Sequence, residues 1–196
     1  MKGKGIYQVK SSEKEIKEYT LSVLTEDKAG LLNHITIIFN RRKININSLN
    51  VSTTEVNGVS RFTIVVNSSK EKIVKVVNHI NKLIEVLGAF LYEENEIYFQ
   101  EIALYKLSSK IFMKGDIVEK IIRKYGAKIL VIEKNHTIIQ KTGSKDETQS
   151  LYNELDKFNG ILEFARSGRV ALSKKKRKTI NFLKQLEKTK SNKLNI

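Results

Sequence analysis

The sequence has no cysteine, proline or tryptophan. Without cysteine there is no disulfide, no thiolate metal site and no cysteine nucleophile. No stretch reaches the roughly 18 consecutive apolar residues of a membrane-spanning helix. Residues 1–17 also lack the apolar run of a signal peptide. We therefore expect a cytoplasmic protein that has no membrane partner.

Positive charge is abundant, with a formal net charge of +15 over 196 residues. Many of these charges lie in residues 174–196, which we expect to be a basic tail, disordered except for a short helix at 180–186. Such a charge can indicate binding to nucleic acid. Because the excess is concentrated in the tail, we do not expect a nucleic-acid partner, and an RNA-binding module is kept as an alternative.

Hydrophobic periodicity in the first half of the chain predicts the order βαββαβ. The apolar phase changes between Ile46 and Leu49, which predicts either a bulge or a strand that starts only at about Asn47. The pair Asn57-Gly58 predicts a hairpin whose strands pair antiparallel. A second helix is expected after Ser68 or Ser69, with apolar residues as far as Ile84. Strands are expected at 19–24, 44–54, 62–66 and 86–92, and helices at 31–42 and 69–84.

The second half repeats this order with different residues. A helix at 115–125 is expected to end at Gly126, and a later helix is expected to carry apolar residues from Leu151 to Phe158. Each half is thus predicted to be a split βαβ, ferredoxin-like sandwich, which makes the protein α+β. Strands of this second unit are expected at 102–107, 128–133, 137–142 and 161–165.

No arrangement of residues indicates catalysis. The histidines, His34, His79 and His136, lack the spacing of metal ligands and are expected at the surface or at its boundary. Ser167-Gly168 is not a nucleophile elbow, since that motif requires glycine where the chain has Ala165. We expect no catalytic residue and no metal site.

One loop suggests binding instead. After the strand at 19–24, a polar loop leads through Gly30 into a helix, whose first N–H groups and dipole suit a carboxylate. The ammonium of a free amino acid would need an acceptor, which Asp27 or the side-chain oxygen of Asn45 could supply. In the alternative interpretation, Asp27 caps the helix, Gly30 permits a close turn and Asn45 is an exposed residue where a strand starts.

These residues resemble the ACT domain of acetolactate synthase small subunits. The resemblance rests on motifs in the same order as in the family, and the phrase Asn45-Ile-Asn-Ser-Leu49 is close to the family's own signature. The motifs are Leu21-Ser-Val-Leu-Thr-Glu-Asp-Lys-Ala-Gly-Leu-Leu32, Phe39 to Val51, Arg61-Phe-Thr-Ile-Val65, Gln100-Glu-Ile-Ala-Leu-Tyr-Lys106, Phe164-Ala-Arg-Ser-Gly168 and Ala171-Leu-Ser173.

The resemblance implies how the chain is divided. The fold is expected to be two consecutive ferredoxin-like βαββαβ units, the first an ACT domain, followed by the basic tail. The expected parts are a flexible N-terminal segment (1–17), the ACT domain (18–93), the C-terminal ferredoxin-like domain of the small subunit (94–173) and the tail (174–196).

The resemblance also implies a function, that of a non-catalytic regulatory subunit in the biosynthesis of valine, isoleucine and leucine. It would bind the large catalytic subunit, raise its activity and confer feedback inhibition by valine. Thiamine diphosphate, Mg and FAD are expected on that catalytic partner, with no cofactor in this chain. In the family the ACT domains dimerise and hold the effector between them. The corresponding positions here are Asp27, Ala29, Gly30, Leu31, Asn45 and Ile46.

Asp27 departs from the family pattern, because valine-sensitive members carry asparagine in this loop. A carboxylate can hold an ammonium, but it donates no hydrogen bond to a carboxylate and repels one nearby. This departure bears on the response to valine and not on the identity of the subunit. Separately, a stand-alone ACT sensor of another pathway is kept as an alternative to the regulatory subunit.

Overall fold

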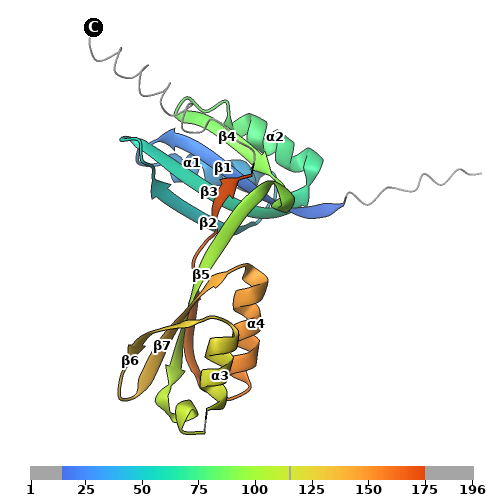
Figure 1. Ribbon diagram of the computed structural model, residues 1–196. Helices are drawn as coiled ribbons and strands as arrows, with labels where there is room; N and C mark the ends of the chain where they lie inside the picture. Colours follow the sequence, from blue (N-terminus) through green and yellow to red (C-terminus); the bar gives the residue numbers. More distant parts are fainter. Residues whose placement is uncertain (1–14, 115, 175–196) are drawn as a thin grey trace, which may run out of the picture.

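The computed structural model describes residues 15–114 and 116–174 as two α+β units joined by a long strand (Figure 1). The expected helix at 180–186, residues 1–14 of the N-terminal segment and the tail after Lys174 lie outside the described residues. The first unit consists of β1 (Ile16–Glu26), α1 (Leu31–Arg41), β2 (Ile46–Thr53), β3 (Val59–Ser69), α2 (Lys70–Ile80) and β4 (Val86–Tyr92).

The second unit follows after a short 3-10 turn, Glu94–Glu96, and repeats the same order of elements. Another 3-10 segment, Ser109–Lys114, precedes its first helix. The elements are β5 (Ile97–Ser108), α3 (Ile117–Lys124), β6 (Lys128–Ile132), β7 (His136–Gly143), α4 (Lys145–Asp156) and β8 (Ile161–Arg166), with an added strand β9 (Val170–Ser173).

Both sheets have the same topology, which confirms the predicted pair of βαββαβ units. The strand order is β2-β3-β1-β4 in the first sheet and β6-β7-β5-β8 in the second, and all recorded pairs are antiparallel. In each unit the helices cover one face of the sheet (Figure 1). The hairpin at Asn57-Gly58 is confirmed by the β2–β3 pair, and the bulge by the register shift between Ile46 and Ser48.

The core of each unit lies between its sheet and its helices. In the first unit, alternate residues of β1 and β3, such as Leu21 and Ile64, meet the buried side of α1 and α2. In the second unit, Tyr105 of β5 is fully buried, and its hydroxyl donates to the backbone oxygen of Thr148 at 2.7 Å. Apolar residues that repeat every two positions in the strands and every 3.6 positions in the helices are therefore buried between the two layers, as the sequence predicts.

Several predicted boundaries were wrong. The helix expected to reach Ile84 ends at Ile80, and Ile84 is 95% exposed. The cause is Asn81, whose side chain bonds both the N–H and the oxygen of Ala89 in β4 and so turns the chain out of the helix. Likewise α4 ends at Asp156, before Phe158, and α3 begins only at Ile117. The strand expected at 102–107 is longer, because its first half pairs with β9.

Candidate functional site

The loop between β1 and α1 is built around Gly30. This residue has φ +85°, the left-handed region that residues with a Cβ rarely adopt, and nothing lies within 4 Å of a Cβ placed there. The backbone conformation, and not the available space, therefore requires glycine. Gly30 is the N-cap of α1, and its oxygen accepts from the N–H of Asn33 at 3.0 Å.

The first turn of α1 carries neither a capping side chain nor an acidic residue. Asp27 does not cap it, so that part of the alternative interpretation is wrong, whereas the turn at Gly30 and the exposed position of Asn45 before β2 agree with it. Its Oδ1 instead accepts from the hydroxyl of Ser60 at 3.0 Å, and its N–H donates to the oxygen of Gly58 at 3.0 Å. Among the described residues, no side chain therefore caps the positive end of this helix.

The other predicted residues, Asn45 and Ile46, lie where β2 begins. Asn45 is exposed and Ile46 is partly buried against the first core. Ile46 pairs with Val66 of β3, whereas Thr53 at the far end of β2 pairs with Ser60, the residue that holds Asp27. At about 3.3 Å per residue, the two ends of this strand are roughly 20 Å apart.

A single chain therefore does not bring the predicted site residues together. Asp27, Ala29, Gly30 and Leu31 share one end of the sheet, and Asn45 and Ile46 share the opposite end. These two half-sites can form one pocket only if a second copy of the chain supplies the missing half.

The described part of the chain offers little support for metal binding, membrane crossing or RNA binding. Residues 15–114 and 116–174 hold no group of three acidic, histidine or cysteine side chains that could bind a metal. Within the same ranges no helix combines the length and the apolar character that crossing a membrane requires. Phe62, the aromatic that an RNA-binding surface would need, is buried in the core of the first unit.

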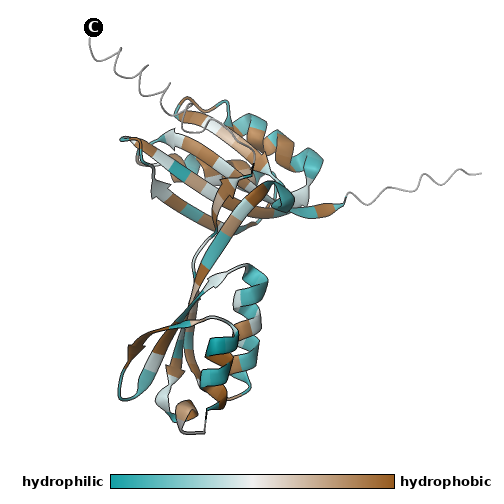
Figure 2. Cartoon of the chain, in the orientation of Figure 1, coloured by the Kyte–Doolittle hydropathy of each residue, from teal (hydrophilic) through white to brown (hydrophobic). Residues whose placement is uncertain are grey.

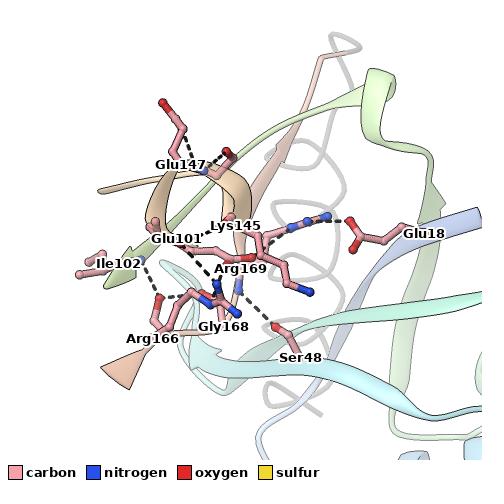
Figure 3. A network of polar contacts seen from close by, with 12 residues as sticks. Glu18, Ser48, Glu101, Ile102, Lys145, Glu147, Arg166, Gly168 and Arg169 are labelled. Carbon is pink, nitrogen blue, oxygen red and sulfur yellow. Dashed lines mark hydrogen bonds and ion pairs between the residues drawn. The ribbon is translucent and has the colours of Figure 1, made fainter. Parts of the chain in front are cut away.

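Sequence reasoning missed a polar network where the two units meet (Figure 3). Its centre is Arg169, which follows β8 and is only 3% exposed. The guanidinium bonds Glu18 Oε1 at 2.7 Å and the Thr20 hydroxyl at 2.8 Å, both on β1. It also lies 3.8 Å from Glu101 Oε1 and 3.8 Å above the centre of the Phe99 ring, both on β5.

The backbone around Arg169 also contacts the first unit. The N–H of Arg169 donates to the Ser48 hydroxyl of β2 at 3.4 Å. A Cβ at Gly168 would lie 3.1 Å from that hydroxyl oxygen and 3.3 Å from the backbone oxygen of Leu49, so a side chain here would press against β2. On the other side, Arg166 Nε lies 3.4 Å from Glu101 Oε2. The motif at 164–168 was the one sequence feature that pointed to this segment. It did not reveal the contacts with β2, because Ser48 and Leu49 are more than 100 positions earlier in the chain.

The fold and the loop define an ACT-type regulatory protein, with a second ferredoxin-like unit attached. A profile described as "AHAS small subunit-like ACT domain" matches residues 21–88, and one described as "Small subunit of acetolactate synthase" matches residues 100–175.

Individual relatives agree with these profiles. An acetolactate synthase small subunit of Mycolicibacterium smegmatis is 35% identical over 156 residues, covering 80% of this chain and 91% of the relative. A probable acetolactate synthase small subunit of Archaeoglobus fulgidus is 35% identical over 155 residues, covering 79% and 96%. The crystal structure of the acetolactate synthase small subunit from Thermotoga maritima matches with a TM-score of 0.73 at 26% identity, covering 81% and 98%.

The chain belongs to the family of acetolactate synthase small subunits. This membership makes it a regulatory subunit and not the catalytic chain.

Proposed function

We propose that this chain binds the catalytic subunit of acetolactate synthase, raises its activity and makes it sensitive to feedback inhibition by valine. The supporting observation is that relatives named as small subunits match both units in order, over about four-fifths of the chain. The name small subunit implies a larger catalytic partner. Thiamine diphosphate, magnesium and FAD would be held by that partner.

The effector would bind between two copies paired along β2. This strand is an edge of the first sheet, and Val51 on it is an exposed apolar residue. Edge strands of two copies can pair antiparallel about a two-fold axis. Antiparallel pairing places the start of β2 beside the far end of its copy, so each loop half-site meets the Asn45–Ile46 half-site of the other chain.

Each half-site then has a chemical role toward a free amino acid. The carboxylate would accept from the first backbone N–H groups of α1, at Gly30 and Leu31, where no acidic side chain competes. The ammonium would donate to the amide oxygen of Asn45 or to Asp27, whose carboxylate already accepts from one hydroxyl. The exposed part of Ile46 offers an apolar contact to the effector side chain.

Reconstitution of the holoenzyme tests the function. Acetolactate formation from pyruvate is measured with the catalytic subunit alone, with this chain added, and with valine added. We expect a higher rate with the chain and a lower rate with valine. No change in rate together with no co-elution would refute the regulatory role. A chain that activates but neither binds valine by calorimetry nor transmits inhibition would refute the effector alone.

Substitution of Asn45 tests the half-site. Asn45→Ala removes one hydrogen bond to an ammonium, which is worth about 1.5–3 kcal/mol, so the valine concentration for half inhibition should rise roughly 10- to 100-fold. Complex formation should be unchanged. Asn153→Ala is the matched control, because Asn153 is exposed on α4 of the second unit. Equal valine responses in both variants would remove Asn45 from the site.

A further inference from the structure

A cavity of about 340 Å³ lies where the two units meet, and we call it the junction cavity. It is on the side of the first sheet that faces away from the helices, because Val65 lines it while Ile64 and Val66 belong to the first core. Ligand pockets have volumes of roughly 300–1,000 Å³ and occur preferentially between domains. The residues that matter below are Asn47 and Ser48 of the first unit and Lys145, Arg166 and Arg169 of the second.

The junction cavity is separate from the proposed effector site. The described residues that line it include none of the six effector residues. Ile46 packs against the first core, between the sheet and its helices, whereas Ser48 faces the second unit and accepts from the N–H of Arg169. The proposed function therefore gives this cavity no role.

The walls of the cavity are polar, with cations in excess. Figure 2 shows a hydrophilic band across β5 between hydrophobic segments, where the strand passes from one unit to the other. The described lining holds three cations, Lys145, Arg166 and Arg169, and two carboxylates, Glu18 and Glu101. Both carboxylates are already paired with arginine, Glu18 at 2.7 Å and Glu101 at 3.4 and 3.8 Å. The remaining cation, Lys145, makes the cavity attractive to an anion.

Several hydrogen-bond donors of the lining have no acceptor among the described residues. The ammonium of Lys145 is exposed at the start of α4 and has no ion-pair partner there, and the side chain of Asn47 has no hydrogen bond within the same part of the chain. The Ser48 hydroxyl accepts one hydrogen bond but donates to no described group. Arg169 is only 3% exposed, yet its buried Nε has no described hydrogen-bond partner. A buried donor without a partner costs free energy, so the position calls for an acceptor from outside the chain.

These donors converge from both units. Figure 3 shows Lys145, Arg166 and Arg169 gathered near Glu101, with Ser48 on the facing strand. An anion in the cavity can therefore accept from β2 and from the second unit at once. Carboxylate and phosphate groups suit this set, because they offer several oxygens to a guanidinium and an ammonium and form short, strong hydrogen bonds with them.

We propose that the junction cavity binds a small metabolite that carries a carboxylate or phosphate group, and that the bound anion bridges β2 to the second unit. Lys145 and Arg166 would contact the anion from the second unit, and Asn47 and Ser48 from the first. The site is independent of the proposed function, and its tests use the full-length chain without the catalytic subunit.

Calorimetric titration with inorganic phosphate and, separately, with acetate is the first test, at constant ionic strength. Binding of phosphate alone assigns a phosphate group to the metabolite, and binding of acetate alone assigns a carboxylate. Lys145→Met removes one charge-assisted contact and should weaken binding about 10-fold or more. Lys120→Met is the matched control, because Lys120 is exposed on α3 and its loss lowers the net charge equally. Binding of neither probe, or an equal loss of affinity in both variants, overturns the proposal.

Substitution of Asn47 tests the bridge between the units. Asn47→Ala removes a neutral donor of the first unit and should weaken binding of the same probe about 3- to 10-fold. Asn153→Ala, which changes an exposed asparagine of α4 that does not line the cavity, is the control. Circular dichroism checks that each variant is folded. Equal affinities of these two variants would remove β2 from the site and overturn the bridge.

Hydrogen exchange followed by mass spectrometry locates the bound anion. The probe that binds should slow exchange in residues 46–49 and 166–169 of the unsubstituted chain, and this protection should be lost in Lys145→Met. Valine should not displace the probe, since no effector residue lines the cavity. Protection confined to other segments, or displacement by valine, overturns a separate site. A chain that binds the anion but fails to activate the catalytic subunit refutes only the proposed function.

Discussion

Replacing Arg169 with methionine should destabilise the protein strongly. Methionine replaces the unbranched aliphatic stem of Arg169 but removes the cation, which pairs with Glu18 at 2.7 Å and with Glu101 at 3.8 Å. Breaking a buried ion pair by removing one partner typically costs 3–5 kcal/mol. Glu101 keeps Arg166 as a partner at 3.4 Å, and the side chain of Glu18 is 31% exposed and can regain water. We therefore expect the low end of that range, about 3 kcal/mol.

Urea unfolding followed by circular dichroism measures this loss, with Arg123→Met as the matched control. Arg123 lies on α3 with its side chain 83% exposed, so the same substitution there should cost no more than about 0.5 kcal/mol. In a second variant, Arg166→Met added to Arg169→Met leaves the buried Glu101 without either arginine and should cost more stability than Arg169→Met alone. A free energy of unfolding for Arg169→Met equal to that of Arg123→Met would refute the view that Arg169 joins the two units.

Three further predictions concern the scaffold. Burial raises the pKa of Tyr105 to about 12, so spectrophotometric titration should show one tyrosine that ionises at a higher pH than the others. Because the folded state favours the neutral phenol, this contribution to stability is lost as the pH rises from about 10 toward 12. Ser144→Ala should cost about 1 kcal/mol, because Ser144 and Glu147 form a capping box at the start of α4. Hydrogen bonds from Ser144 lower the pKa of Glu147, so the ionised carboxylate of Glu147 stabilises the fold at neutral pH. In acid unfolding curves this stabilisation should disappear as the pH falls through the lowered pKa. Asn81→Ala should cost about 1–3 kcal/mol in thermal unfolding, since it strands the N–H of Ala89.

The elements with clear periodicity could be predicted from the sequence. In α1 the buried residues Leu31, Ile35, Ile38 and Phe39 repeat at helical spacing, and no competing contact alters that pattern. The end of α2 could not be predicted in this way, because apolar residues continue the helical spacing past the true end. A side-chain contact from Asn81 to a strand eight residues further on decides the boundary instead.

Long-range partners explain what sequence reasoning missed. β9 is too short to be recognised alone, and it exists because β5 supplies a partner some 70 positions earlier in the chain. Arg169 has its strongest contact with Glu18, 151 positions away. A lone arginine among many basic residues carries no local signal of burial. The loop at Gly30 was found because its glycine, helix start and polar residues are contiguous, whereas the separation of the two half-sites depends on strand register.

Residues 168 and 169 bring the second unit into contact with β2, the strand that carries half of the proposed effector site. Ile46 lies two residues before Ser48, whose hydroxyl accepts from the Arg169 backbone, and Gly168 packs tightly against the same strand. Packed contacts of this kind do not stretch gradually, because interiors are close-packed and incompressible. A shift of the start of β2 on effector binding must therefore either move the 166–169 segment with it or break the Ser48 contact. Since that segment leads directly from β8 into β9, either response alters the start of β9, where Val170 pairs with Gln100 of β5.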